Sequence, residues 1–338
     1  MVVLACAAYA LAPHNRKLML ATLRFGGDLV LKGWEFLAWA AAAYALGLVA
    51  YYLIEERPKR SKSLRFFAVI LVFLRSPAAA FKNRLSREDR VAVLTTLLKA
   101  FFGPFMVMAL VQHVLGAIDN GLAIVASVEQ QPGWLELFNR HGYWFAMKVI
   151  LFADVLVFTV GYLVESPRLN NEIRSVDPTL LGWTAALLCY PPFNQLTGAI
   201  LGSSVTDFPK FEDPMTHVAL NVLLLALMAF YASASVALGL KASNLTHRGI
   251  ISRGPYAWIR HPAYTAKNMA WWIGSIPFVE VAFKQSLAAG VTAMATVAGW
   301  TLLYVLRAIT EEDHLRGVDD EYANYAARVR YRFIPGVV

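Results

Sequence analysis

Apolar runs close to membrane-spanning length constrain this chain more than any other feature. Five long apolar segments cover residues 29–54, 91–118, 143–164, 217–240 and 286–309. A helix that crosses the hydrocarbon core of a bilayer needs about 20 apolar residues. Because lipid offers no partners to backbone N–H and C=O groups, such segments must be helical. The sequence therefore predicts an all-α fold, a polytopic membrane helical bundle.

Composition agrees with this class. Hydrophobic residues make up 58% of the 338 residues and charged residues 16%, whereas a soluble domain has about 25% charged residues. Two further apolar segments, 179–201 and 268–283, contain prolines. With these and the shorter segments before residue 91, we predict seven to eight spans, and the ambiguity lies entirely before residue 91.

Three other segments carry specific expectations. Residues 1–12 are apolar but lack the basic leader and small-residue cleavage site of a signal peptide, so we expect a short or interfacial first helix. Residues 66–74 are too short to span, and a re-entrant or interfacial helix continuing to residue 81 is expected there. Residues 119–142 contain several polar and charged positions and are interpreted as a long polar loop.

Loop charge indicates the orientation. Cytoplasmic loops of membrane proteins are enriched in Lys and Arg. The net charge of +8 also favours contact with anionic lipid headgroups. We expect no nucleic-acid partner, since the chain has no soluble basic domain. The loops predicted to be cytoplasmic are 55–65, 82–90, 241–267 and the C-terminal tail, and the loops predicted to lie outside are 119–142 and 203–216.

The cysteines and metal-ligating residue types give no sign of a cross-linked or metal-bound fold. Cys6 and Cys189 both lie in apolar segments, which suggests neither a disulfide framework nor a zinc site. No cluster of His, Cys and Asp is present in the sequence, so we predict no metal. The oligomeric state is left open.

A polar, aromatic loop at residues 250–264 separates two of the apolar segments. Arg260 and His261 are residue types that bind carboxylates or phosphates. The rings of Tyr256 and Tyr264 could lie against a cation or an adenine. The alternative is a basic aromatic loop at the headgroup level, where Trp, Tyr and Arg are enriched in any case.

A second polar cluster follows one apolar hairpin later. Arg307 and Glu311 are four residues apart on one helix face, so they can pair, and Glu312 lies on the same turn. The simpler interpretation is a solvated helix end with one ion pair. Two adjacent carboxylates near an Arg-His loop instead suit a cofactor with a carboxylate, an ammonium, a diol and an aromatic base. S-adenosylmethionine has all four groups, and its sulfonium favours aromatic and carboxylate neighbours.

The two clusters form a longer pattern. The pattern G-P-Y-x-x-x-R-H-P-x-Y, an apolar hairpin and R-x-x-x-E-E-x-x-L resembles the isoprenylcysteine carboxyl methyltransferase and phospholipid methyltransferase superfamily. The likeness covers residues 238–335, the C-terminal third of the chain. The matching residues are Gly254, Pro255, Tyr256, Arg260, His261, Pro262, Tyr264, Arg307, Glu311, Glu312, Leu315, Tyr322, Tyr325, Val329 and Pro335.

The resemblance implies a function and a site. It implies an S-adenosylmethionine-dependent methyltransferase whose cofactor site lies on the cytoplasmic side, with direct in-line transfer to a lipid-embedded or small hydrophobic acceptor. Residues 217–338 would form the methyltransferase-like core and tail, and residues 1–216 the membrane helices that shape the acceptor pocket. The implied catalytic residues are Arg307 and Glu311. The implied cofactor-binding residues are Ile251, Gly254, Tyr256, Arg260, His261, Tyr264, Glu311 and Glu312.

Two other functions fit parts of the sequence. The tail at 331–336 also resembles that of NADPH-dependent sterol reductases, but Leu315 occupies the place of a cysteine expected there, and the paired glutamates favour methyl transfer. A non-enzymatic membrane protein that retains the fold is the other alternative. Its support is the departure from the family pattern at Ala266, often a glycine, and at Lys267-Asn268. The acceptor stays open among prenylcysteine, phospholipid amine, small thiol and polyprenyl or sterol-like lipid.

A few polar residues inside or between the apolar segments are further candidates. Intramembrane charges such as Lys148 and Asp154 are functional candidates by default. These two are six residues apart and should not face each other, and Asp154 could instead satisfy a neighbouring helix. The proline-rich break at 189–194 indicates either a simple kink or a substrate cavity. The loop at 168–174 is either a solvated connection or a cover for the site.

Overall fold

The computed structural model describes all residues except 27, 55–60, 77–84, 203–204 and 338. The helices are α1 (Val2–Leu11), α2 (Arg16–Leu20), α3 (Gly33–Ile54), α4 (Lys62–Arg75), α6 (Arg87–Ser127), α7 (Trp134–Leu137), α8 (Tyr143–Leu163), α9 (Leu180–Leu187), α10 (Phe193–Leu201), α11 (Pro214–Leu238), α12 (Pro262–Gln285), α13 (Leu287–Val318) and α14 (Glu321–Arg328). The strands are β1 (Thr22–Arg24), β2 (Val30–Lys32), β3 (Ser175–Val176) and β4 (Thr246–His247), which form two antiparallel pairs.

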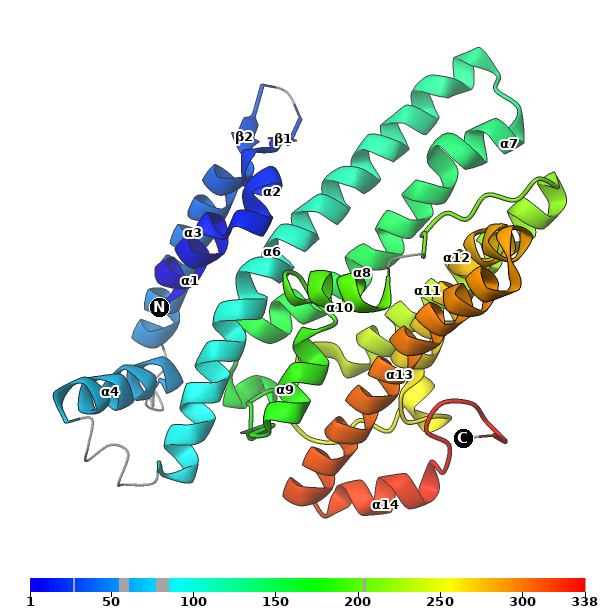
Figure 1. The fold of residues 1–338 in the computed structure, drawn as a ribbon. Coiled ribbons are helices and arrows are strands. Elements are labelled where there is room, and N and C mark those ends of the chain that lie inside the picture. The colour runs from blue at the N-terminus through cyan, green and yellow to red at the C-terminus, as the bar shows by residue number, and fades with distance from the viewer. Residues whose placement is uncertain (27, 55–60, 77–84, 203–204, 338) are drawn as a thin grey trace.

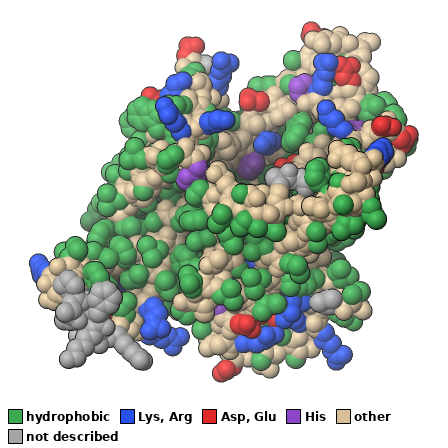
Figure 2. Space-filling model, in the orientation of Figure 1, with side chains coloured by type: hydrophobic (Ala, Val, Ile, Leu, Met, Phe, Trp, Pro, Cys, Tyr) green, Lys and Arg blue, Asp and Glu red, His purple; other side chains and the backbone are tan. Residues whose placement is uncertain are grey.

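The long helices form a bundle in which packing passes from α6 to α8, α11, α12 and α13 (Figure 1). Among the described residues, five helices are long and apolar enough to cross a membrane, namely α3, α6, α8, α11 and α13. Apolar side chains cover the middle of the molecule, and charged side chains gather at its two ends (Figure 2). The all-α, membrane-type fold predicted from sequence is therefore confirmed in its class. The count of seven to eight spans and the orientation stay predictions.

The expectation of a polar loop at residues 119–142 was wrong. Helix α6 continues without a break to Ser127, through Gly103 and Pro104, and helical turns fill most of the rest up to α8. Asn120 does not end the helix, because its side-chain amide donates to the carbonyl of Gly116 one turn earlier, at 2.7 Å. With 41 residues, α6 is about 60 Å long. It is therefore longer than the bilayer core is thick, and must extend beyond it.

The N-terminal region follows the predictions more closely. Residues 1–12 form the short helix α1, which packs against α3 and α6. Helix α4 begins at Lys62 and ends at Arg75, and the predicted continuation to residue 81 lies outside the described residues. The buried side chains that join this region to α6 are Met19, Leu23, Leu37, Met108, Val111 and Leu115.

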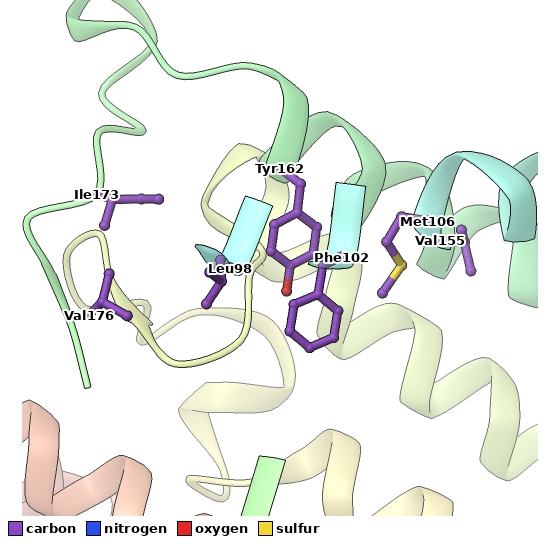
Figure 3. Close-up of a cluster of buried hydrophobic side chains, with 7 residues drawn as sticks. All are labelled: Leu98, Phe102, Met106, Val155, Tyr162, Ile173 and Val176. Carbon is purple, nitrogen blue, oxygen red and sulfur yellow. The ribbon is translucent and has the colours of Figure 1, made fainter. Parts of the chain in front are cut away.

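A second core lies between α6 and α8 (Figure 3), and it positions the loop that carries β3. The rings of Phe102 and Tyr162 stack with their centroids 5.2 Å apart. The hydroxyl of Tyr162 accepts hydrogen bonds from both the backbone and the side-chain nitrogens of Asn244, each 2.8 Å long. This core therefore holds Asn244 and the neighbouring strand β4 in place. The members of this core are Leu98, Phe102, Met106, Val155, Tyr162, Ile173 and Val176.

The two predicted parts of the chain, 1–216 and 217–338, meet directly. Strand β3 belongs to the first part and pairs with β4 of the second, with Ser175 opposite His247 and Val176 opposite Thr246. Helix α8 of the first part also packs against α11 of the second. The division of roles between them stays a prediction, but the candidate site is built with side chains from both.

Candidate functional site

Glu312 is the centre of a closed cluster of charges at the end of the bundle. Its side chain is 0% exposed. One carboxylate oxygen accepts from Arg260 Nε at 2.8 Å and Arg332 Nε at 3.0 Å, and lies 3.1 Å from His261 Nε2. The other accepts from Arg316 Nη2 at 2.8 Å and Arg332 Nη2 at 2.9 Å. Both oxygens are thus used by the protein, as a buried carboxylate requires.

The same cluster ties the C-terminal tail to the loop before α12. Arg260 donates to the carbonyl oxygens of Val329 at 2.9 Å and Arg330 at 2.7 Å. The backbone N–H groups of Arg260 and His261 donate to the carbonyls of Tyr331 and Arg332, both at 3.0 Å. The hydrogen bond to Glu312 raises the pKa of Arg332 above its usual value. Loop, helix α13 and tail therefore form one unit.

Helix α14 covers this unit from outside. Tyr322 and Tyr325 are buried on its inner face, where they pack with Val329, Ile250 and Leu315. The Tyr325 hydroxyl donates to the carbonyl oxygen of residue 256 at 2.9 Å. Burial raises the pKa of both α14 tyrosines, so they stay neutral donors. The cover fixes the Gly-Pro-Tyr turn, which forms a short 3-10 helix at Gly254–Ala257.

Glu311 has far fewer hydrogen-bond partners in the protein than Glu312 has. One of its oxygens accepts a hydrogen bond from the Tyr264 hydroxyl at 2.7 Å. The Tyr264 ring stacks on His261 with centroids 5.3 Å apart. Their spacing allows Arg307 and Glu311 to pair, but no ion pair joins these two described residues. Arg307 Nη2 donates to Asn244 instead, and its guanidinium lies over the Tyr264 ring, 5.1 Å from the centroid.

Glu311, Tyr264 and Arg307 meet at a small cavity. Its volume is about 20 Å³, which is room for roughly one water molecule. The donor and acceptor groups around it are two carboxylates, a phenol, a guanidinium, two hydroxyls and an imidazole. Its lining residues are Asp177, Leu245, Thr246, Tyr264, Arg307, Thr310, Glu311, His314 and Leu315.

Beside this cavity, deeper in the bundle, the rings of Tyr231, Trp271 and Tyr304 surround the side chains of two cations, and we call this group the aromatic box. Lys267 Nζ is 5.3 Å from the ring centroid of Trp271 and 5.7 Å from those of Tyr231 and Tyr304. The guanidinium of Arg307 is 5.8 Å from the Tyr304 centroid. Such distances give cation–π attraction. In the described part of the chain, neither cation forms an ion pair with a carboxylate, so the box holds two positive charges without a direct counter-charge.

The remaining intramembrane acid is linked to the box through one tyrosine. Asp154 accepts hydrogen bonds from Tyr231, at 3.1 Å, and from Ser235, both on α11. The prediction that Asp154 satisfies a neighbouring helix is thus confirmed. Lys148 packs instead against Gly116 of α6, where a Cβ would lie 3.1 Å from its Cε. The two intramembrane charges do not meet, as their spacing predicted.

The proline-rich break at 189–194 also reaches the box. The ring of Tyr190 lies 5.5 Å from the guanidinium of Arg307 and 4.9 Å from the ring of Phe102. It therefore joins the second core to the site and is more than a kink. Sequence reasoning named the break that contains Tyr190 as a possible substrate cavity, but it missed Tyr231 and Tyr304, because no motif spacing connects aromatic residues on separate segments. The only signal was the unusual Lys267, a cation within an apolar helix.

The other residues predicted to bind the cofactor lie on the loop before α12. Ile251, Gly254 and Tyr256 are outside the lining of the small cavity. Gly254 has φ +59°, which suits glycine, and a Cβ there would lie 3.2 Å from Ala237 of α11. The structure thus brings together Arg260, His261 and Glu312 as one group, and Tyr264, Arg307 and Glu311 as another. The roles of all these residues stay predictions.

Comparison with known proteins gives one match. A sequence-family model described as "Protein of unknown function (DUF1295)" matches residues 200–329. The matched region contains both groups of site residues and the helices α11 to α14. No curated protein and no solved structure matches the chain. The match thus groups the C-terminal region with a family whose description states no activity.

Proposed function

We propose that this protein is an integral-membrane S-adenosylmethionine-dependent methyltransferase that acts on a lipid-embedded or small hydrophobic acceptor. The observation that carries the proposal is the contrast between the two adjacent glutamates. Glu312 is fully used in holding the loop, helix α13 and the tail together. Glu311 has one protein donor and lines a cavity together with Tyr264 and Arg307. A cationic ligand group can therefore reach Glu311.

The chemistry of the cavity lining fits the cofactor. Glu311 would bind the ammonium group, Arg307 the carboxylate, and the ring of Tyr264 lies near a position for the sulfonium. Thr246, Thr310 and His314 supply polar groups for the ribose. Pockets that hold ligands of this size have volumes of about 300–1,000 Å³. Because the cavity has about 20 Å³, binding requires side chains to move apart.

The closed Glu312 cluster would limit where that movement occurs. Since Arg260, His261 and Arg332 all bind Glu312, the loop and the tail move as one unit. The groups held by single hydrogen bonds, such as Tyr264 and His314, are the easier ones to displace. We therefore assign Glu312 a positioning role and Glu311 a binding role.

The aromatic box is the proposed acceptor side. With Arg307 used for the cofactor, the cation Lys267 of the box favours an acceptor with an anionic head and repels an ammonium. When bound, the cofactor supplies a methyl group on a positively charged sulfur. The protein's own contribution would be to hold the acceptor atom in line with that methyl group, where positioning alone gives a large acceleration. An anionic acceptor atom has no proton to lose, so no general base is required.

A binding experiment tests this function. Calorimetry with S-adenosylhomocysteine should show binding to the wild-type protein and a loss of about tenfold or more in Glu311→Gln. Asp313→Asn is the matched control, because Asp313 is an exposed acid on the same helix. Stabilisation by NADPH without stabilisation by S-adenosylhomocysteine would overturn the proposal in favour of a reductase. Binding of neither would favour a non-enzymatic role.

A further inference from the structure

A second pocket lies on the other side of the β3–β4 pair. Its volume is about 250 Å³, and it opens at the end of the bundle where α6 begins and α13 ends. Ser175 and His247 line this pocket. Thr246, next to His247, and Asp177, two residues after Ser175, line the small cavity instead. The lining residues are Arg87, Arg174, Ser175, His247, Val318 and Asp319.

Positive charge dominates this pocket. Arg87 and Arg174 line it, and among the described residues neither forms an ion pair with an acid. The one acid in the lining, Asp319, lies 2.7 Å from His247 Nε2 and is engaged there. Burial lowers the pKa of His247, and the charges of Arg174 and Lys241 lower it further, although Asp319 opposes them. The pocket therefore has a positive potential.

Lys241 approaches Arg174 across a glycine. Gly249 has φ +99°, a conformation that side-chain-bearing residues rarely adopt. A Cβ at this position would lie 3.0 Å from Lys241 Nζ and 3.6 Å from both terminal nitrogens of Arg174. The missing side chain leaves space between the two cations. The backbone N–H of Arg174 donates to the carbonyl of His247 at 2.9 Å, which anchors this arrangement to β4.

We infer that this pocket binds a phosphate group, held by Arg174 and Arg87 of its lining and by Lys241, which lies beside Arg174 across Gly249. Converging cations repel one another, and an anion between them reduces that cost. The acids nearby are Asp319, which is engaged with His247, and Glu321, whose charge acts on Lys241. Arginine forks and a lysine ammonium together match the several acceptor oxygens of a phosphate. The pocket is lined from the start of α6 and the end of α13, which lie at one end of the bundle (Figure 1), so a lipid headgroup and a soluble phosphate can both reach it. The inference does not depend on methyl transfer.

Thermal unfolding in an uncharged detergent tests the site. Inorganic phosphate, titrated against chloride at matched ionic strength, should raise the unfolding temperature in a saturable way. In Arg174→Gln/Lys241→Gln the apparent affinity should fall about tenfold or more. The matched control is Arg16→Gln/Arg24→Gln, which removes two exposed cations far along the chain and should keep the wild-type response.

The source of the phosphate is distinguished in a second arm. Mixed micelles with phosphatidylglycerol are compared with micelles containing diacylglycerol, which has no phosphate. Saturation by inorganic phosphate indicates a soluble ligand, and a response to phosphatidylglycerol alone indicates a headgroup. Equal responses in the wild type and the double variant, or no saturable response in either arm, would overturn the inference.

Two further measurements distinguish loss of the phosphate site from misfolding of the double variant and from failure of the proposed function. Arg87→Gln removes an exposed cation at the start of α6 and should weaken phosphate binding even if the double variant folds poorly. Binding of S-adenosylhomocysteine should be unchanged in the folded variants, because Arg87, Arg174 and Lys241 are outside the small cavity. A phosphate site and the proposed methyltransferase can therefore fail independently.

Discussion

The Glu312 cluster and the aromatic box differ in how their buried charges are balanced. The carboxylate of the cluster is fully paired, whereas the cations of the box lie against aromatic rings. In the Glu312 cluster, formed by Glu312 with Arg260, His261, Arg316 and Arg332, every carboxylate oxygen has protein partners. In the aromatic box, Lys267 and Arg307 lie against rings and have no ion pair in the described chain. Removing one member of a fully paired buried cluster is strongly destabilising, because it leaves the other charges buried and uncompensated. A buried cation without an ion pair can still attract a ligand of opposite charge. Neighbouring residues can thus differ in role.

The largest expected effect comes from breaking the Glu312 cluster. Glu312→Ala leaves three buried or half-buried cations without their acceptor, and removal of one partner from such a cluster costs about 3–5 kcal/mol. We expect a large fall in unfolding temperature, measured by intrinsic fluorescence in detergent. Glu311→Gln is the control, with a fall several times smaller. Equal falls in both variants would show that the two glutamates do not differ in role.

Glu165, which pairs with Lys62 and Lys99, tests whether ion pairing also stabilises the fold outside the Glu312 cluster. Burial alone would raise the pKa of Glu165, but the ammonium groups of Lys99 and Lys62 outweigh it and lower the pKa to about 2. Because the folded pKa is below the unfolded value, this stabilisation is present above about pH 4.5 and is lost as the pH falls towards 2. The lost stabilisation is on the order of 3 kcal/mol.

The pH prediction is checked with denaturant unfolding between pH 5 and pH 3. The wild-type protein should lose stability over this window, and Glu165→Gln should lose less because its amide does not titrate. The variant should also be the less stable of the two at pH 5. An identical pH dependence in both proteins would contradict the assignment of this stabilisation to Glu165.

A smaller effect is expected for the hydrogen bond between Tyr264 and Glu311. Tyr264→Phe keeps the ring against His261 and Arg307 but removes the 2.7 Å hydrogen bond. The cost should be about 1 kcal/mol. A double-mutant cycle with Glu311→Ala, which removes the acceptor, isolates this interaction. A coupling energy near zero would mean that the hydroxyl makes no net contribution to folding.

The smallest effect on stability is expected in the aromatic box. Lys267→Met removes a buried charge that has no carboxylate within ion-pair distance and keeps the aliphatic stem, so the stability should change by less than about 1 kcal/mol or rise. Binding of an anionic amphiphile such as oleate, measured by native mass spectrometry, should nevertheless weaken. A large loss of stability would place Lys267 with the Glu312 cluster instead, as a residue that holds the fold.

The sequence by itself determined the membrane class, the positions of most helices and the residues of the two polar clusters. These follow from local causes, because lipid requires long apolar helices and polar residues end or interrupt them. The same local logic failed at residues 119–142, where side-chain bonds within the helix let α6 continue through polar positions.

Only the tertiary structure decided which polar groups meet. Adjacent residues on a helix point about 100° apart, so the sequence could not say which of Glu311 and Glu312 faces the tail and which the cavity. That choice depends on Arg332, which lies 20 residues further along the chain. The aromatic box and the β3–β4 pair likewise join segments that are far apart in sequence. Lipid and local hydrogen bonding determine where helices form, whereas packing between distant segments determines which charges are paired.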